Sequence, residues 1–452
     1  MREFVHTIAA PATSPAGSAI SIIRISGEKS LEIINLMTDT KIKKPNQMYL
    51  RNIFDNNKNI IDKALVVFFK KPLSYTGEDM AEIHCHGGFT AYSRIYSTIL
   101  EYGARAATKG EFTRRAFLNG KLDLAQAEGV NSLINATNNM LADNSLKIMD
   151  GIFSRKIKEI REEIIELNAY VEAYIDFPDD EVEEITGDFL KIRVEKFLNQ
   201  IKKIKNSYNI FKKLSDGIKI VIIGRPNTGK SSLLNAVLRE ERAIVTEIEG
   251  TTRDILREKT QINGITVSFI DTAGLRNSED IIETEGIKRT RENAEKADFI
   301  IFMLDGAKNL TEEDKDIYQS IKDRKKLILI NKADVGSKIS EKDFPGENVI
   351  NISLKTGFNY DRFEEFINNN ICLENFCENE NIEFFIDNER YVSALSKVEK
   401  SLENILNTYQ NTPLEYVAED FREALNILSE IIGEVYTDDI LDKIFSTFCI
   451  GK

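Results

Sequence analysis

One stretch, Gly217–Leu234, constrains the fold of this 452-residue chain more than any other. The apolar run Ile218–Ile223 predicts a buried parallel strand, and the apolar start of a helix follows the next loop. That loop reads Gly-Arg-Pro-Asn-Thr-Gly-Lys-Ser, which is the GxxxxGKS phosphate-binding pattern in the strand–loop–helix setting that supports it. We therefore expect an α/β domain that binds a nucleotide at this loop.

The residue types in this loop suit phosphate chemistry. Two glycines let the backbone curl around a phosphate chain, and the N-terminus of the following helix adds partial positive charge. The Lys230 ammonium would reach the outer phosphates, and the Ser231 hydroxyl would bind Mg²⁺. The nucleotide-binding residues predicted here are Asn227, Thr228, Gly229, Lys230, Ser231 and Ser232.

Two later stretches extend the phosphate and metal site. A mobile switch loop is expected at Gly250–Asp254, where Thr252 or Thr251 can offer a hydroxyl to the same Mg²⁺. The predicted strand Thr266–Ile270 then runs into Asp-Thr-Ala-Gly, so that Asp271 would stand beside the metal and Gly274 would bring its N–H to the terminal phosphate. The predicted contacts of this motif are Asp271, Thr272, Ala273 and Gly274.

A third stretch selects guanine. The predicted strand Leu327–Ile330 ends in Asn-Lys-Ala-Asp, where the Asp334 carboxylate can accept hydrogen bonds from guanine N1–H and N2–H₂, which adenine cannot supply. A further strand, Val349–Ile352, would bring a loop over the base. The predicted base contacts are Asn331, Lys332, Asp334, Ser353, Leu354 and Lys355. Together the motifs resemble the GTP-binding domain of translation-factor-type GTPases.

Length and composition place this domain in a larger protein. A chain of this length is expected to form two or three domains, and its 42% hydrophobic and 29% charged residues are typical of a soluble globular protein. No apolar run approaches a membrane span, and the N-terminus has no signal-peptide pattern, so we expect an intracellular, cytoplasmic protein. The net charge of −13 excludes general nucleic-acid binding, so a nucleic-acid partner would need a local patch.

The segments outside the nucleotide domain have their own patterns. Residues 1–118 predict an α+β domain, in which His84 and His86 share one face of a strand and indicate a structural role rather than a metal site. Residues 119–216 and 374–452 are helical, with the nucleotide domain at 217–373 between them. Their apolar stripes need partners, so we expect both parts to pack as one bundle with the nucleotide domain inserted. One such stripe contains Phe421, Leu425, Leu428, Ile432 and Val435.

Several further stretches are distinctive, namely Ile22–Gly27, Tyr75–Asp79, His86–Gly88, Phe117–Ala127, Asn388–Arg390 and the final Phe448–Lys452. With the nucleotide-binding motifs, they resemble the MnmE (TrmE) family of tRNA-modification GTPases over the full length. One departure is Cys85 in the turn where family members often have glycine. The resemblance implies a multidomain fold: an α+β N-terminal domain, an all-α bundle and an inserted Ras-like P-loop GTPase domain.

The same resemblance implies cofactors and partners. The N-terminal domain would form a homodimer and bind 5-formyl- or 5,10-methylene-tetrahydrofolate, with Arg24, Glu82, Lys121 and Lys452 at the folate-contacting positions. The partner would be MnmG, an FAD protein, in a heterotetramer. Together they would install an aminomethyl-type group, such as carboxymethylaminomethyl, on carbon 5 of the wobble uridine of certain tRNAs.

Hydrolysis needs groups that the common GTPase motifs lack here. Leu275 stands where Ras-type GTPases place the water-orienting glutamine. Asn227 could hold a monovalent cation beside the phosphates, with further ligands from the switch loop, and the resemblance implies K⁺ in that role. The resemblance also matches Glu283 to the family's water-activating glutamate; from the residues alone Glu283 is one acid among several neighbours. The expected K⁺ ligands are Asn227, Thr246, Ile248 and Thr251, and Thr246 is also an expected GTP contact.

Two segments leave alternatives open. Cys449 could be a thiol buried by an apolar tail, or a nucleophile toward the uracil ring that the tail delivers to the folate pocket. The basic stretch Lys196–Lys213 is expected to be the solvated face of a helix, with an RNA contact as the alternative. For the whole chain, the alternative function is an Era- or Der-like ribosome-assembly switch, which predicts an RNA-binding module after the GTPase domain.

Overall fold

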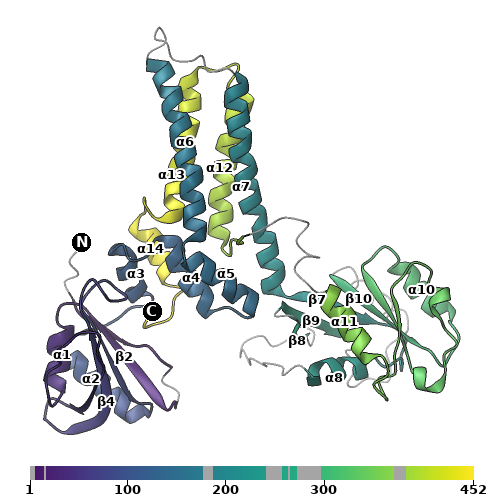
Figure 1. Ribbon diagram of the computed structural model, residues 1–452, viewed down its shortest axis with the longest axis horizontal. Helices are drawn as coiled ribbons and strands as arrows, with labels where there is room; N and C mark the ends of the chain where they lie inside the picture. Colours follow the sequence, from purple (N-terminus) through teal and green to yellow (C-terminus); the bar gives the residue numbers. More distant parts are fainter. Residues whose placement is uncertain are drawn as a thin grey trace. The chain divides into compact units, whose positions relative to one another are not determined.

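The computed structural model describes residues 6–14, 17–176, 187–240, 257–262, 265–271, 297–370 and 383–452. The chain forms two compact units. The first contains Met1–Ile134, Ser145–Lys205 and Glu389–Lys452, and the second contains Asn135–Asn144 and Asn206–Asn388. The elements confirm the expected multidomain class, with an α+β domain, a helical bundle and an α/β domain inserted in the helical sequence (Figure 1).

The N-terminal domain is a mixed sheet with helices α1 and α2 packed on one face. Its strand order is β3–β4–β5–β2–β1–β6, and only the β1–β6 pair is parallel. Alternate residues of β2 and β5 enter the core with the helices, which leaves Arg24, Glu82 and His84 together on the other face. The bounds are β1 Ile8–Pro11, β2 Ile20–Ser26, β3 Tyr49–Phe54, β4 Ile60–Phe69, β5 Met80–His86, β6 Arg105–Ala106, α1 Ser30–Met37, α2 Phe89–Glu101 and α3 Glu111–Leu118.

The helical bundle combines segments from both sides of the nucleotide domain, as expected. Helix α13 packs against both α6 and α12, and Arg161 of α6 donates a 2.8 Å hydrogen bond to Ser429 of α13. None of the described helices is long and apolar enough to cross a membrane. The bounds are α4 Leu124–Ile134, α5 Asn139–Met149, α6 Ile152–Asp176, α7 Gly187–Asp216, α12 Glu389–Thr408, α13 Leu414–Ile432 and α14 Asp438–Phe445.

One detail of the predicted apolar stripe on α13 is wrong. The helix ends at Ile432 because Gly433 adopts a left-handed φ of 78° and closes it. A Cβ on Gly433 would lie 2.7 Å from the Leu124 Cβ, so only glycine fits this contact with α4. Val435 therefore lies beyond the helix and is 53% exposed, instead of extending the stripe.

The nucleotide domain is an α/β layer structure. Its sheet runs β12–β11–β10–β7–β9–β8, with only β8 antiparallel to its neighbour. Buried residues on both faces of the central strands form two separate core clusters, as expected for a sheet covered on both sides. The bounds are β7 Ile218–Ile223, β8 Arg257–Ile262, β9 Ile265–Asp271, β10 Phe299–Asp305, β11 Lys326–Asn331, β12 Val349–Asn351, α8 Lys230–Glu240, α10 Glu312–Ser320 and α11 Tyr360–Asn370.

The second unit also includes residues that precede and follow the nucleotide domain. The buried Asn144 side chain donates to the Phe385 carbonyl at 2.8 Å and accepts from the Phe385 N–H at 2.9 Å. The Asn138 amide similarly contacts the Leu214 carbonyl and the Thr266 hydroxyl of β9. Buried amide contacts therefore hold the chain before and after the nucleotide domain, at Leu214 and Phe385, against Asn138 and Asn144, a feature that no local sequence pattern predicted.

Candidate functional site

The phosphate-binding loop joins β7 to α8, as predicted. Gly224 and Gly229 adopt left-handed φ values of 146° and 107°. A Cβ at Gly224 would lie 2.2 Å from the Met303 carbonyl oxygen, so this position excludes any side chain. The Lys230 ammonium lies 2.8 Å from the carbonyl oxygens of Gly224 and Arg225, which holds its positive charge within the curve of the loop.

Asn331 connects this loop to the predicted base-binding segments. Its buried side chain donates to the Thr228 carbonyl at 2.8 Å and accepts from the Leu354 N–H at 3.2 Å. A Cβ at Gly229 would meet the Asn331 amide nitrogen at 2.2 Å, so the loop approaches Asn331 closely only because the residue is glycine. The structure thus brings together two motifs that lie about a hundred residues apart.

The carboxyl ends of the parallel strands lie at one edge of the sheet, where open α/β sheets bind ligands. The register places Asp271 beside Ile222, Asp305 beside Asn331, and Asn351 beside Ile330. The predicted phosphate loop and the motifs at 271 and 331 therefore start from the same edge of the sheet.

Asp334 is exposed at this edge. It lies in the short 3₁₀ turn Ala333–Val335, and its Oδ1 accepts a 2.7 Å hydrogen bond from the Ser353 hydroxyl. The neighbouring Lys332 makes a 2.7 Å ion pair with Asp305, a contact that the sequence did not predict. Burial would raise the pKa of the Asp305 carboxyl, but the hydrogen bond and charge of Lys332 outweigh it and lower that pKa.

Four further residues predicted for the nucleotide site are exposed. Ser231 and Ser232 are exposed in the first turn of α8, Asn227 is exposed with a left-handed φ of 65°, and the Lys355 side chain is also exposed. The remaining predicted phosphate, metal and water-activating residues, Thr246, Ile248, Thr251, Thr252, Thr272, Ala273, Gly274 and Glu283, lie outside the described residues.

A second polar cluster lies on the open face of the N-terminal sheet. Arg24 makes a 2.8 Å ion pair with Glu82, and the other oxygen of Glu82 lies 3.0 Å from His84 Nε2. Burial would raise the pKa of the Glu82 carboxyl, but the hydrogen bond from His84 and the charge of Arg24 outweigh it and lower that pKa. The Arg24 guanidinium also lies 6.0 Å from the centre of the Tyr75 ring.

The C-terminal tail is seated against the same domain. Gly110 N–H donates to the Cys449 carbonyl at 3.3 Å, Phe112 N–H donates to the Lys452 carbonyl at 3.2 Å, and Arg24 reaches the Gly451 carbonyl at 3.4 Å. An apolar cluster anchors the segment just before the tail. Its buried members are Phe117, Leu124, Ala127, Leu441, Ile444, Phe445 and Phe448.

The tail brings Lys452 to the Arg24–Glu82 cluster. Burial and the nearby charge of Arg24 both lower the pKa of the Lys452 ammonium. Cys449 is exposed, so the expected alternative of a thiol buried by the tail does not describe it. Lys121 is exposed beside the loop that carries Tyr75, and its ammonium lies 3.2 Å from the Pro72 carbonyl.

Comparisons with known proteins match this organisation. Residues 7–121 match the family model of the N-terminus of the GTP-binding protein TrmE, and residues 124–449 match that of the MnmE helical domain. The chain is 40% identical to the tRNA modification GTPase MnmE of Clostridioides difficile (strain 630), over 99% of both chains. It is 39% identical to that of Aquifex aeolicus over 100% of both, and 42% identical to that of Alkaliphilus metalliredigens over 99% of both.

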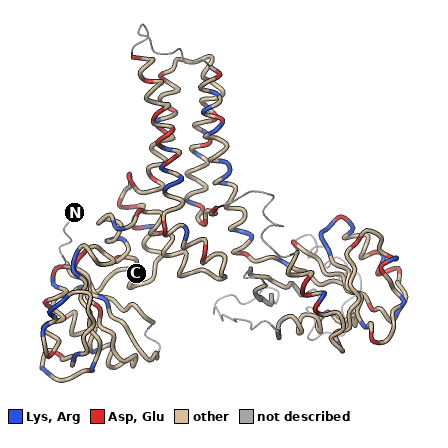
Figure 2. Tube along the Cα trace, in the orientation of Figure 1, with Lys and Arg blue, Asp and Glu red and all other residues tan. Residues whose placement is uncertain are grey.

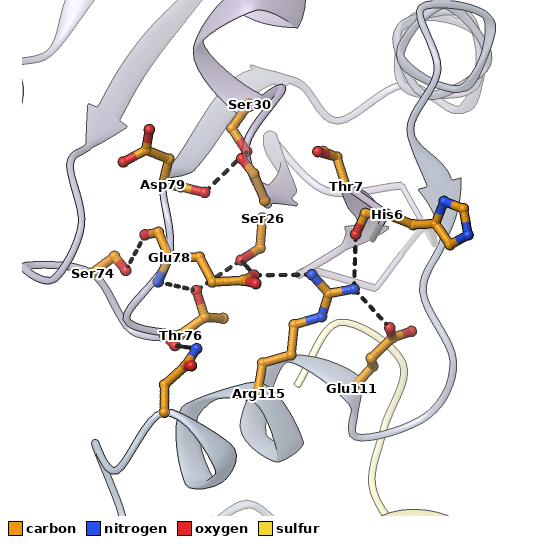
Figure 3. Close-up of polar contacts among 12 residues, drawn as sticks. His6, Thr7, Ser26, Ser30, Ser74, Thr76, Glu78, Asp79, Glu111 and Arg115 are labelled. Atoms are coloured by element: carbon orange, nitrogen blue, oxygen red, sulfur yellow. Dashed lines mark hydrogen bonds and ion pairs between the residues drawn. The ribbon is translucent and has the colours of Figure 1, made fainter. Parts of the chain in front are cut away.

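The chain belongs to the MnmE family. One family-like stretch, Tyr75–Asp79, is held by a buried network that the sequence did not predict (Figure 3). Arg115, only 1% exposed, reaches Glu78 at 2.9 Å and both Glu111 and the His6 carbonyl at 3.0 Å. Glu78 in turn accepts from the Ser26 hydroxyl at 2.8 Å, so the network fixes the loop that carries Tyr75 to strand β2.

Glu111 is the most strongly perturbed acid of this network. Burial would raise its pKa, but hydrogen bonds from Arg105 and the Thr108 N–H and the charge of Arg115 lower it to about 2. A fixed Arg–Glu core of this kind holds α3 against the MnmE-type loop. A sequence signal was available in the spacing of Glu111 and Arg115, which at i and i+4 share one face of a helix, although no helix was predicted there.

The basic stretch on α7 follows the expectation of a solvated helical face. Lys202 and Lys205 form ion pairs with Glu399 of α12, and Lys202 also reaches Glu403 at 2.9 Å. Lys196 likewise pairs with Glu163 of α6. Acids of neighbouring helices therefore neutralise much of the positive charge that had suggested RNA binding.

Proposed function

We propose that this MnmE-family chain is a K⁺-dependent GTPase that acts in the cytoplasm on certain tRNAs. It would form a heterotetramer with an FAD-containing MnmG partner. Together they would install a carboxymethylaminomethyl or aminomethyl group at carbon 5 of the wobble uridine. The observation that carries the proposal is the meeting of Arg24, Glu82 and Lys452 on one face of the N-terminal domain. Residues more than four hundred positions apart converge there beside an exposed cysteine. The domain with the GTP-binding motifs would supply the driving cycle.

In the GTPase part, each residue has a defined task. Lys230 would neutralise the outer phosphates, while Asn331 keeps the phosphate loop in register with the base-binding segment. Asp334 would accept from guanine N1–H and N2–H₂. Mg²⁺ would be bound by Ser231 and Thr252, and Glu283 would position the attacking water.

A monovalent cation fits the available donors. The Asn227 side chain is exposed on a loop residue with a left-handed φ, and its oxygen is a hard ligand of the kind that K⁺ takes. Thr246, Ile248 and Thr251 would complete the shell. We expect Asn227→Ala to retain nucleotide binding but lose the stimulation of hydrolysis by KCl over NaCl. Equal wild-type rates in the two salts would refute the cation assignment.

The N-terminal cluster suits a folate-type one-carbon donor. Glu82 offers a carboxylate acceptor for ring N–H donors, and Arg24, Lys121 and Lys452 offer positive charge for the acidic end of such a molecule. The bound donor would supply a one-carbon unit. The residues named here would bind it and orient it toward the tail.

Cys449 would activate the uracil ring. Attack of its thiolate on ring carbon 6 forms a carbon–sulfur bond and shifts the C5–C6 electron pair to carbon 5, which can then bond to the one-carbon electrophile. Loss of the carbon 5 proton and elimination of the thiolate would restore the ring. The exposure of Cys449 supports this use.

A homodimer is supported by apolar residues on the open face of the N-terminal sheet. Ile20, Leu50 and Leu65 are 58%, 53% and 39% exposed, and Leu50 and Leu65 lie opposite each other in adjacent strands. Exposed apolar side chains grouped on one sheet face are typical of an interface. A second copy of the domain would cover them.

The test of the modification is made in cells. Mass spectrometry of wobble nucleosides should show the modified uridine lost from a deletion strain and restored by the wild-type gene. Cys449→Ser should hydrolyse GTP near the wild-type rate yet restore no modified nucleoside. If the serine variant fully restores the modified nucleoside, Cys449 is not the nucleophile. If the deletion strain keeps an unchanged nucleoside profile, the proposed function is refuted.

The ribosome-assembly alternative receives no support from the C-terminal part. It predicted an RNA-binding module after the GTPase domain. The described residues 383–452 instead contain α12, α13 and α14, which complete the helical bundle.

A further inference from the structure

We propose that four exposed lysines of the N-terminal domain, Lys43, Lys44, Lys70 and Lys71, form a docking surface for the sugar–phosphate backbone of RNA. We call these four residues the lysine patch. The inference rests on the proposed tRNA function and adds where the RNA is held.

The charge of the chain is divided unevenly. Residues 1–118 contain 16 Lys and Arg against 11 Asp and Glu, a balance of +5, whereas the whole chain carries −13. The rest therefore carries −18 and repels a polyanion. Since phosphate neutralisation supplies most of nucleic-acid affinity, an RNA would be attracted to the N-terminal domain.

The fold gathers the four lysines although they come from two segments. Asn46 N–H donates a 2.8 Å hydrogen bond to the Phe68 carbonyl, which brings the segment after Lys44 to the end of β4 just before Lys70. All four lysine side chains are exposed. The patch therefore lies at one end of the β3–β4 pair.

The patch lies beside the proposed one-carbon site. Pro72 directly follows Lys71, and its carbonyl lies 3.2 Å from the Lys121 ammonium, which is a proposed folate contact. The same loop continues to Tyr75, which packs by the Arg24 guanidinium. A phosphate backbone on the patch would thus lie next to the proposed one-carbon site, where the uridine must react.

The positive charge of the patch is not neutralised by neighbours. Within the described part of the chain, none of the four lysines forms an ion pair, in contrast to Lys202 and Lys205 of α7, which pair with Glu399. Asp79 accepts a hydrogen bond from the Lys71 backbone N–H at 2.9 Å and not from its ammonium. Figure 2 shows basic and acidic residues mixed along the paired helices of the bundle.

The test compares two sets of lysines in the full-length protein. The patch variant replaces all four lysines with glutamine. The control replaces Lys203, Lys212 and Lys213, exposed lysines of α7 without ion pairs among the described residues. It also replaces the exposed Lys191 of the same helix, which lies 4.0 Å from Glu195, so that both variants lose four charges. Binding of an unmodified tRNA transcript with uridine at the wobble position is measured by fluorescence anisotropy at several salt concentrations.

We expect the patch variant to bind the transcript at least about tenfold more weakly at low salt and to lower the log–log salt slope by about two to three, since each lost phosphate contact removes close to one unit. The control should keep the wild-type slope. GTP hydrolysis without RNA should be the same in all three proteins, which verifies folding.

Four results would overturn the proposal. Three of them are an unchanged salt slope in the patch variant, an equal loss in the control, and a loss confined to binding of the acidic tail of a polyglutamylated folate or of an acidic partner protein. A wild-type protein that does not bind the transcript would also overturn it. The wobble-nucleoside profile of the deletion strain is measured separately, so the failure of the patch and the failure of the proposed function are distinguishable.

Discussion

The two candidate sites of this molecule are built in opposite ways. The GTP site collects short motifs at the carboxyl ends of neighbouring parallel strands, where Gly224 and Asn331 are placed by strand register. The N-terminal site joins a sheet face to a tail more than four hundred residues away, through Arg24 and Gly451. The first site lies within one domain. The second forms only when the helices of the bundle hold the C-terminal tail against the N-terminal domain.

This difference determines how each site tolerates damage. A loop fixed by backbone geometry fails when one glycine or one carboxylate changes, because no other residue can supply the same group. A site held by a tail fails when the tail moves, although every catalytic side chain is still present. Mutations should therefore separate the two sites cleanly.

The largest effect is expected at Asp334. Asp334→Asn should lower GTP affinity by about 10³-fold, because the amide oxygen can accept only one of the two guanine hydrogen bonds, without charge, while the amide NH₂ opposes the second donor. It should gain affinity for xanthosine triphosphate, since the amide can donate to the xanthine carbonyl. Equilibrium binding of fluorescent analogues of GTP and xanthosine triphosphate measures the change in specificity. Equal GTP affinity in mutant and wild type would refute the assignment of Asp334 to base recognition.

The next effect is expected at Gly451. Its Cβ would lie 2.0 Å from the Pro11 carbonyl oxygen, and its φ is a left-handed 91°, so alanine must displace the tail. We expect Gly451→Ala to reduce the modified wobble nucleoside by about 100-fold, the usual cost of a misplacement near 1 Å, with GTP hydrolysis unchanged. Gly120→Ala is a matched control, because it also has a positive φ but nothing within 4 Å of its Cβ. Normal modification in the Gly451 variant would show that the tail position is irrelevant.

Much of the GTP site was predictable because its signals are local. The strand Ile218–Ile223 was predicted with its observed bounds, and β11 extends its predicted core by one residue at each end. Motif order then placed Asn331 and Asp334 at the same edge, since parallel strands share their carboxyl ends. What the motifs could not provide was the contact of Asn331 with Thr228, which depends on close approach at Gly229.

The N-terminal domain was predicted less completely. Strands β1, β3 and β6 and helices α1 and α3 were not predicted, because short, mixed segments carry weak periodicity. The Arg115 network was missed because its partners, Glu78 and the His6 carbonyl, are distant in sequence. Local pattern also extended α13 to Val435, whereas the glycine before it ends the helix. The folate positions came from family resemblance and not from spacing.

The smallest expected effect concerns acid stability of the N-terminal site. The Glu111 carboxyl has a pKa of about 2, below its usual 4.5, so its ion pairs stabilise the fold fully above pH 4.5 and are lost as the pH falls toward 2. The lowered pKa corresponds to a contribution of at most about 3 kcal/mol at neutral pH. Glu111→Gln should therefore lower the free energy of unfolding of the N-terminal domain at pH 7, with a difference from wild type that shrinks as the pH falls.

The matched comparison is Glu101→Gln, an exposed acid at the end of α2 without an ion pair among the described residues. Urea unfolding of the full-length proteins, followed by tyrosine fluorescence at several pH values between 7 and 3, measures the stability of both variants.

Because Glu111 binds Arg105 and Arg115, its replacement should also loosen α3, whose Phe112 N–H donates to the Lys452 carbonyl of the tail. Wobble-nucleoside levels should then fall while GTP hydrolysis does not. A Glu111 variant that is as stable as the Glu101 variant at pH 7 would show that the buried ion pairs add no net stability, as buried pairs sometimes do not.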